Sequence, residues 1–331
     1  MNLGAESLTT VELAAGATVG PYRLVRELGS GLTSEVWLGS HADERNARAI
    51  ALKLPFVALD HERFLECFAR ERPMLSGLAH PCIARVYDAG VAAGSRPYVA
   101  MEYVQGVPLL QYCDRMLLGI DSRLLLFDQV LEAVQHAHSM LVLHRDLKPS
   151  SLIVTPEGQV LVLDFGVGSL LIEGTAVESE TVPLGGRALT PDYASPEQLA
   201  GKPLGIGGDL YSLGVILCEL LVGARPYRLK RFSRRGMEEA LLNLDPAIPS
   251  TLVTTEAAAL RGTSAKQLAR TLRGDMDTII LKSLHKRAVG RYATVEALAQ
   301  ELRRFRRGEP LLARHVGPLQ RIWKRARRKL G

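Results

Sequence analysis

Two aspartates with a lysine between them are the residues of this sequence best suited to chemistry. The run LHRDLKPSS at 143–151 places Lys148 two residues after Asp146, and LDFG at 163–166 places Asp164 after the next apolar run. A carboxylate can orient a hydroxyl group, and a nearby ammonium can neutralise a phosphoryl oxygen. A carboxylate at the end of a strand is a hard ligand that suits Mg²⁺. Together these residues indicate phosphoryl transfer.

A glycine-rich segment, GSGLTSEV at 29–36, lies between two strand-like runs. Glycines at Gly29 and Gly31 let a hairpin backbone approach phosphate oxygens without a Cβ in the way. The alternative is an ordinary glycine-rich hairpin. A dinucleotide-binding turn is disfavoured because a strand-like run, EVWLG, follows in place of a helix.

Lys53 stands in the apolar run AIALKL, 17 residues after Val36. A lysine on such a strand either meets an anion in a pocket or extends its ammonium to water along the surface. Glu71, on the next predicted helix, is a candidate carboxylate partner for Lys53, and a solvated glutamate is the alternative.

Hydrophobic patterning predicts a small sheet followed by a mainly helical region. Short alternating segments at 22–28, 35–40, 49–54 and 98–104 predict strands, and 61–78 carries a helical stripe that Pro73 interrupts. Beyond Gly106 the segments 123–141 and 209–223 predict helices, and 152–165 predicts a hairpin that turns at 156–158. The segments 169–190 and 228–275 are predicted to be loops or insertions. The fold class is therefore α+β.

Charge and cysteine content exclude several functions. The net charge of +6 is concentrated in residues 301–331, which hold 11 Lys/Arg against 2 Asp/Glu, so residues 1–300 carry 30 basic and 33 acidic residues. A mildly acidic body argues against nucleic-acid binding as the main function. The four cysteines lack metal-ligand spacing and are predicted to be buried, reduced thiols. The first twenty residues lack the pattern of a secretion signal, and no apolar run reaches membrane-spanning length.

With these motifs in order, the sequence resembles a bacterial eukaryotic-like (Hanks-type) serine/threonine protein kinase, from about Tyr22 to Leu311. The Ser195-Pro196-Glu197 segment resembles the family's Ala-Pro-Glu motif, and Arg291 resembles the arginine that pairs with that glutamate. The resemblance implies a bilobal kinase fold, with a small antiparallel sheet and one main helix in the N-lobe and a larger, mainly helical C-lobe. The implied boundaries are an extension at 1–20, an N-lobe at 21–104, a C-lobe at 105–311 and a tail at 312–331.

The resemblance also implies a role for each matching residue. Asp146 would orient the substrate hydroxyl, Lys148 would neutralise the γ-phosphate, and Lys53 would hold the α- and β-phosphates of ATP. Glu71 would pair with Lys53 in the active state. Asp164 and Ser151 stand at the metal-binding positions, for Mg²⁺ or alternatively Mn²⁺. The implied ATP-binding residues are Leu28, Gly29, Ser30, Gly31, Val36, Ala51, Lys53, Met101, Glu102, Val104 and Ile153. The implied substrates are Ser and Thr hydroxyls of proteins, including the kinase's own.

Two positions depart from the family pattern. Ser34 replaces the third glycine of the loop, which should cost little. Ser151 replaces an asparagine that binds the second Mg²⁺, and a serine hydroxyl is a shorter, weaker ligand. This replacement is the basis of an alternative hypothesis, a pseudokinase scaffold that binds nucleotide with weak or no catalysis.

Regulation and localisation are predicted from two further segments. Arg145 beside Asp146 favours control by phosphorylation, with Thr181 as the preferred acceptor, although a solvated hydroxyl without a role is the alternative. Thr190 matches the threonine that contacts the catalytic Asp and Lys.

The pattern of the tail at 312–331 indicates a basic amphipathic helix that binds an anionic membrane surface or an acidic partner. The alternative is a solvated tail that packs Trp323 on the C-lobe. The expected location is cytoplasmic, and the membrane hypothesis for the tail would place the protein peripherally at the inner face of the membrane.

Overall fold

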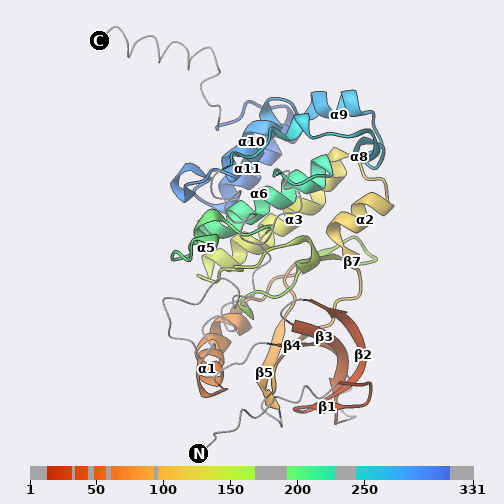
Figure 1. Cartoon of the computed structure of the whole chain (residues 1–331), viewed down its shortest axis with the longest axis vertical. Coiled ribbons are helices and arrows are strands. Elements are labelled where there is room, and N and C mark those ends of the chain that lie inside the picture. Colours follow the sequence, from red (N-terminus) through yellow and green to blue (C-terminus); the bar gives the residue numbers. More distant parts are fainter. Residues whose placement is uncertain are drawn as a thin grey trace, which may run out of the picture.

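The computed structural model describes residues 13–31, 34–43, 48–56, 61–92, 96–167, 192–227 and 244–313. Figure 1 shows two lobes stacked along the long axis, with a curled sheet and one long helix at one end and a bundle of helices at the other. This arrangement agrees with the expected α+β, bilobal architecture. Thr181, Thr190 and the tail beyond Ala313 lie outside the described residues.

The N-lobe sheet is antiparallel in every pairing, in the order β1-β2-β3-β4-β6-β5. Its strands and the accompanying helix are β1 (Thr18–Val19), β2 (Tyr22–Ser30), β3 (Ser34–His41), β4 (Ala49–Pro55), α1 (His61–Gly77), β5 (Val86–Ala92) and β6 (Arg96–Glu102).

The C-lobe begins with a second small sheet, in the order β7-β8-β9. Its elements are β7 (Val107–Pro108), α2 (Leu109–Arg115), α3 (Ile120–Ser139), η2 (Pro149–Ser151), β8 (Leu152–Val154), β9 (Val160–Val162), α5 (Pro196–Leu199), α6 (Ile206–Val222), η4 (Pro249–Thr251), α8 (Thr255–Ala259), α9 (Ala265–Leu272), α10 (Asp275–Ser283), η5 (Ala288–Gly290) and α11 (Val295–Arg307).

Alternation along β4 separates a buried face from a face that can bind ligand. Ile50, Leu52 and Leu54 are buried against the inner strands, whereas Ala51 and Lys53 are partly exposed. Successive strand residues point to opposite faces, so the apolar run AIALKL places Lys53 opposite the leucines. The pattern that predicted the strand also fixed the face on which its lysine lies.

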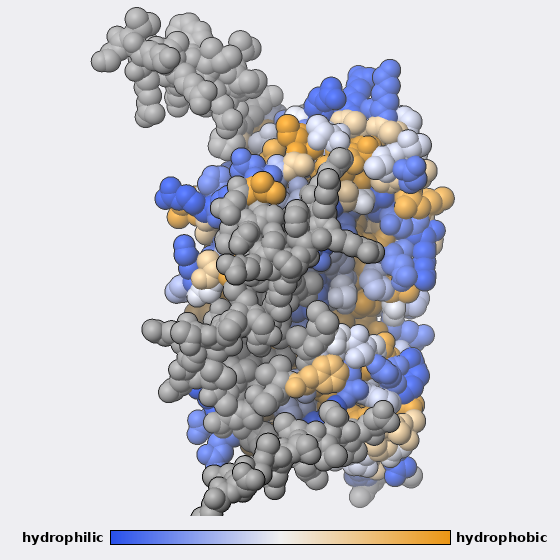
Figure 2. All heavy atoms as spheres, in the orientation of Figure 1, coloured by the Kyte–Doolittle hydropathy of each residue, from blue (hydrophilic) through white to orange (hydrophobic). Residues whose placement is uncertain are grey.

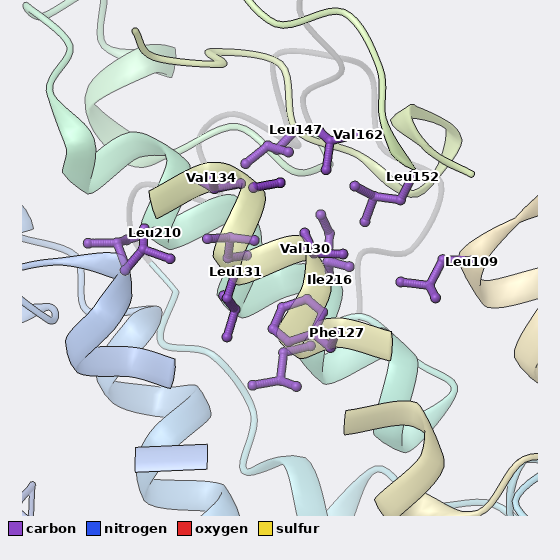
Figure 3. Packing of buried hydrophobic residues seen from close by; sticks show 14 of the residues in the cluster. Leu109, Phe127, Val130, Leu131, Val134, Leu147, Leu152, Val162, Leu210 and Ile216 are labelled. Carbon is purple, nitrogen blue, oxygen red and sulfur yellow. The ribbon is translucent and has the colours of Figure 1, made fainter. Parts of the chain in front are cut away.

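A continuous hydrophobic core joins α1 to the C-lobe. Phe64, Cys67, Phe68 and Leu75 of α1 belong to the same buried cluster as α3 and α6. Figure 3 shows Phe127, Val130, Leu131 and Val134 of α3 at the centre of this packing, beside Leu147 and Val162. On the face shown in Figure 2, the hydrophobic residues of the described surface lie among hydrophilic ones. The core therefore supports the segments that carry Asp146 and Asp164.

The four cysteines all lie in the described part of the chain and, as predicted, are buried thiols outside any disulfide: Cys67, Cys82, Cys113 and Cys218. The apolar run around Leu213 is the buried helix α6, and Glu219 within it accepts a hydrogen bond from the Tyr193 hydroxyl at 2.6 Å. Among the described residues, no helix has both the length and the apolar character needed to cross a bilayer.

Pro73 does not interrupt the first helix, contrary to the prediction. Helix α1 runs from His61 to Gly77 with Pro73 inside it. A proline in a helix removes one backbone hydrogen bond. Pro73 lies on an exposed side of α1, where water can hydrogen-bond the carbonyl that has lost its partner. The penalty is thereby reduced.

The prediction of loops over 228–275 is wrong for its C-terminal part. Helices α8 and α9 form there, and Thr254 and Ser264 cap them by accepting the backbone N–H groups of Ala257 and Gln267. Such caps satisfy donors that a helix start leaves without partners. The mixed charge that indicated loops belongs to the exposed sides of short helices. Residues 228–243 lie outside the described residues.

The predicted outer ends of the two lobes, at residue 21 for the N-lobe and residue 311 for the C-lobe, need adjustment. The last residues of the predicted extension form β1, whose Val19 is buried in the N-lobe core. At the other end, Ala313 is buried and its backbone N–H donates to Glu301 on α11 at 2.9 Å. The C-lobe packing therefore extends past Leu311. Strand β5 was not predicted, and β6 ends at Glu102, before the predicted end at residue 104.

Candidate active site

The segment that follows α3 is held to α6 through its backbone. The N–H groups of His144 and Arg145 donate to the two carboxylate oxygens of Asp209, each at 2.9 Å. His138 lies 2.8 Å from the same carboxylate. Burial alone would raise the pKa of Asp209, but its hydrogen bonds with His138 and with the backbone N–H of His144 hold that pKa below the ordinary value. A buried carboxylate thus anchors the loop that carries Asp146.

His144 links the two candidate aspartates through the backbone. Its Nδ1 accepts the N–H of Asp146 at 3.3 Å, and its Nε2 lies 2.8 Å from the carbonyl of Leu163, the residue before Asp164. These partners assign the neutral ring with the proton on Nε2. The ring packs edge-on against Phe165 with 4.8 Å between centroids. One side chain therefore sets the spacing of the two segments.

Asp146 and Lys148 form the first lysine–carboxylate pair. Lys148 Nζ donates to Asp146 Oδ2 at 2.6 Å, and both side chains are partly exposed. Leu147 between them is buried and points into the core beside Val162 (Figure 3). Because neighbouring side chains on an extended segment point in opposite directions, burial of Leu147 places Asp146 and Lys148 together on the partly exposed side of the loop.

Asp164 and Lys53 form the second pair, which joins the two lobes. Lys53 Nζ on β4 donates to Asp164 Oδ2 at 2.9 Å. Asp164 has a φ of 65°, which is unusual for a residue with a side chain. Burial alone would raise the pKa of Asp164, but the ammonium of Lys53 holds that pKa below its ordinary value. The carboxylate is therefore charged at neutral pH and available to a cation.

The implied pairing of Lys53 with Glu71 differs from the structure. Glu71 on α1 lies 4.0 Å from Arg70, and the ion pair of Lys53 is with Asp164. Asp164 is the carboxylate within hydrogen-bond distance of Lys53. The pairing of Lys53 with Glu71, which the resemblance implies for the active state, therefore stays a prediction.

Ser151 lies next to Asp164 through the backbone. Its carbonyl accepts the N–H of Leu163 at 2.8 Å. Its hydroxyl oxygen is buried and has no hydrogen-bond partner among the described residues. A buried hydroxyl without a protein partner fits an oxygen ligand or a partner for bound water. Asp164 and Ser151 together therefore suit a hard cation.

The protein supplies few ligands at this site, which favours a cation whose remaining ligands come from substrate and water. Within the described segments, no group of three or more His, Cys, Asp and Glu side chains is placed to hold a metal ion. Mg²⁺ is commonly bound by one or two carboxylates together with phosphate oxygens and water. The residues present fit that kind of site.

The predicted nucleotide-binding residues of the sheet share one face. In the register of the sheet, Val36 is opposite Lys53, and Ala51 is opposite Met101. Residues directly opposite one another point to the same face, and so do residues two apart on one strand. Val36, Ala51, Lys53 and Met101 therefore lie on one face of the sheet. The structure brings these four predicted residues together.

The remaining predicted residues border this face. Leu28, Gly29 and Ser30 end β2, and the Gly31 N–H donates to the Ser34 carbonyl at 2.9 Å. Residues 32 and 33 lie outside the described residues. Glu102 ends β6 and Val104 follows it, while Ile153 on β8 comes from the C-lobe.

Gly106 is required where the chain passes from one lobe to the other. A Cβ on Gly106 would stand 2.3 Å from the carbonyl oxygen of Val154. Any side chain there would push the segment after Val104 away from β8.

The segment Ser195-Pro196-Glu197 is anchored as its resemblance implied. Glu197 receives two hydrogen bonds from Arg291, at 2.5 and 2.8 Å. The Arg291 side chain is fully buried, and it also donates to the Gly207 carbonyl. The ion pair therefore fixes α5 to the N-terminus of α6.

Sequence reasoning missed the roles of Asp209, His144 and Gln198. Asp209 was noted only as part of a helix, and His144 only as part of a motif. Gln198 donates from Nε2 to the Arg145 carbonyl at 2.6 Å. The sequence signal for Gln198 was a capping box, a serine followed three residues later by glutamine, which predicts a helix start but not its neighbour.

The fold and the arrangement of the site residues have the two-lobed architecture of a protein kinase domain. The chain belongs to the protein kinase domain family, whose model matches residues 22–302.

Curated relatives and a solved structure support this assignment. The chain is 32% identical over 296 residues to the serine/threonine-protein kinase PknB of Mycobacterium tuberculosis, covering 87% of this chain and 43% of that protein. It is 30% identical over 286 residues to the serine/threonine-protein kinase PrkC of Bacillus subtilis, covering 86% and 40%. The crystal structure of a point mutant of the M. tuberculosis PknI kinase domain matches with a TM-score of 0.63 and 25% identity, covering 89% of this chain and all of that one. The chain thus spans about two fifths of the length of these curated relatives. Protein kinases use ATP and a divalent metal ion.

Proposed function

We propose that this chain transfers the γ-phosphoryl group of ATP to serine and threonine hydroxyls of proteins, including its own. The observation that carries the proposal is that two lysine–carboxylate pairs, Lys148–Asp146 and Lys53–Asp164, belong to neighbouring segments. The two ring nitrogens of His144 join the backbones of these segments. Relatives named as serine/threonine kinases support the choice of substrate class. So does Lys148, which favours serine/threonine over tyrosine kinases.

Each residue has a defined task in the reaction. Asp146 orients the substrate hydroxyl and accepts its proton as the hydroxyl oxygen bonds to the γ-phosphorus. The bond from phosphorus to the β,γ-bridging oxygen breaks, and ADP leaves. Lys148 neutralises charge on the transferred group, and Lys53 holds the α- and β-phosphates.

Asp164 and Ser151 would hold Mg²⁺, with Mn²⁺ as the alternative. When bound, such a cation neutralises phosphate charge. The weaker hydroxyl ligand at Ser151 is the one feature that favours the pseudokinase hypothesis. Its burial beside the Asp164 segment supports retention of a metal-binding role.

The decisive test compares the wild-type chain with Asp146→Ala. We expect the wild type to transfer label from ATP to itself and to a generic basic protein with Mg²⁺ or Mn²⁺. Asp146→Ala should reduce the rate by about 10³-fold and leave nucleotide binding within about twofold, because a group that acts in the transition state contributes little to ground-state binding. If the wild type binds ATP but transfers no label with either metal, the chain is a pseudokinase.

We also propose, from the sequence, that the basic tail at 312–331 brings the enzyme to the cytoplasmic face of an anionic membrane. In a helical arrangement of LQRIWKRARRKL, the apolar residues would share one face and the six cations would occupy the remainder. Sedimentation with anionic and neutral vesicles tests this proposal. Binding to anionic vesicles that survives deletion of 312–331, or no binding by the full chain at moderate salt, would refute it.

A further inference from the structure

The peptide group between Arg145 and Asp146 is held at both of its ends. Its N–H, from Asp146, donates to Nδ1 of His144 at 3.3 Å. Its carbonyl, from Arg145, accepts from Nε2 of Gln198 at 2.6 Å. Because this peptide directly precedes Asp146, its orientation sets the direction in which the Asp146 side chain leaves the backbone.

The backbone at this peptide adopts a conformation that needs support. Arg145 has a φ of 67°, in the left-handed region that residues with side chains rarely enter. Asp209 fixes the N–H of Arg145 at 2.9 Å, so the conformation is held from α6 on one side. Gln198 holds it from α5 on the other side. Strain of this kind persists only where neighbouring groups determine it.

Gln198 is itself well fixed. It is 4% exposed, and its Oε1 accepts the Ser195 N–H at 2.9 Å while its own N–H donates to Ser195 Oγ at 3.3 Å. The neighbouring Glu197 is anchored to Arg291. The amide therefore has one oxygen committed to the cap of α5 and one donor committed to the loop that carries Asp146.

We propose that Gln198 is a positioning residue for phosphoryl transfer, acting through the Arg145–Asp146 peptide. The inference rests on the proposed function. Loss of the Gln198 donor leaves the Arg145 carbonyl without its side-chain partner and releases one end of the peptide. The Asp146 carboxylate then departs from the line to the substrate hydroxyl, while the nucleotide-binding face of the sheet is unaffected. Turnover depends on Gln198, and ATP affinity does not.

The test pairs two variants that damage the same helix cap. Gln198→Met removes both side-chain hydrogen bonds of the amide, including the one to Arg145. Ser195→Ala removes the other half of the cap and leaves the Gln198 amide in place. We expect Gln198→Met to lower kcat by about 10²-fold with KM for ATP within about twofold, since small displacements of catalytic groups have effects of this size. Ser195→Ala should lower kcat by less than about threefold. Equal losses in the two variants, a wild-type kcat in Gln198→Met, or a change confined to KM would overturn the proposal.

A second variant and a second readout protect the test from misfolding and from an inactive wild type. Gln198→Glu keeps an acceptor for Ser195, and its ionised form has no donor for Arg145. Its kcat should fall relative to wild type as the introduced carboxyl ionises with rising pH; a parallel pH profile would contradict the inference. Hydrogen exchange of amides 143–148 should accelerate in Gln198→Met and not in Ser195→Ala. This exchange difference is measurable even if the wild type transfers no phosphate, in which case the proposed function fails separately.

Discussion

The two lysine–carboxylate pairs of the site have the same chemistry and different origins. Lys148 and Asp146 are two residues apart, and their pair belongs to a single loop. Lys53 and Asp164 are 111 residues apart, and their pair exists only when β4 of the N-lobe meets the segment after β9. One half of the site is therefore local, and the other half depends on how the lobes meet.

The surroundings of the pairs differ in the same way. The loop that carries Asp146 is held by Asp209 of α6 and Gln198 of α5, and by His144 within the loop itself. Among the described residues of the N-lobe, Lys53 is the one that forms an ion pair with Asp164. The hydroxyl-orienting side is therefore fixed by backbone hydrogen bonds, and the phosphate-holding side is fixed by a side-chain contact between the lobes.

The largest expected effect comes from breaking the pair that joins the lobes. Lys53→Met should lower kcat/KM for ATP by about 10³-fold, because it removes a phosphate ligand and leaves Asp164 without its partner. Lys148→Met is the matched control and should lower kcat while KM for ATP stays within about twofold. Steady-state kinetics at several ATP concentrations separate the two. If both variants change only kcat, the two pairs do not differ in the way described.

Next in size is the buried ion pair that fixes α5. Burial alone would raise the pKa of Glu197, but Arg291 holds it below the ordinary value of 4.5. A lowered pKa in the folded state contributes stability above pH 4.5 that is lost as pH falls through the lowered value. Glu197→Gln should therefore reduce the free energy of unfolding by about 3 kcal/mol at pH 7, and by less in acid.

Denaturant titrations between pH 7 and pH 3 measure this dependence. Glu309→Gln, which breaks an exposed pair with Arg304, is the control and should cost less than about 1 kcal/mol. A cost for Glu197→Gln that does not shrink with falling pH would mean that the carboxylate charge is not the source of the stability.

A smaller effect is expected where the local half of the site departs from the family. Ser151→Asn should raise kcat or lower the Mg²⁺ requirement, because an amide carbonyl reaches a cation better than a hydroxyl does. A gain of about tenfold corresponds to about 1.4 kcal/mol of transition-state stabilisation. Rates across a Mg²⁺ titration provide the measurement. An unchanged or reduced rate would show that the loop has adapted to serine.

The smallest effect concerns strain outside the catalytic residues. Leu141 has a φ of 61° and is 88% exposed, so its side chain contributes little packing at a strained position. Leu141→Gly should raise the free energy of unfolding by about 1 kcal/mol. The same change at Leu125, exposed within α3, should lower it by about 1 kcal/mol. Thermal unfolding of both variants would test the sign, and a loss of stability in both would refute the strain at Leu141.

Local patterns in the sequence predicted the elements that carry the local half of the site. The apolar runs around Asp164 predicted a hairpin, and β8 and β9 form it, with Gly158 in a left-handed turn conformation at φ 82°. The alternation in AIALKL predicted the strand of Lys53. The contact between Lys53 and Asp164 was beyond such patterns, because no periodicity relates residues in different lobes.

The errors arose where a local signal was ambiguous. Thr254 and Ser264 are common in loops and at helix starts alike, and tertiary packing of Ala258 and Leu272 decided for helices. Pro73 predicted a break that solvent exposure made tolerable. The contact of Gln198 with Arg145 needed a fold in which α5 faces the loop, and no motif records that geometry.

The burial of all four cysteines makes each thiol a reporter of local opening in its part of the structure. Cys67 lies on α1, Cys82 in the segment between α1 and β5, Cys113 on α2 and Cys218 on α6. A thiol-specific reagent reaches a buried cysteine only after the surrounding structure opens, so each labelling rate measures the opening of its own neighbourhood. Burial also raises the pKa of Cys82 and of Cys218, and that of Cys113 to about 11, which keeps these thiols unreactive in the closed state. The order in which the sites become labelled would thus report whether the lobes open independently, without the addition of any probe residue.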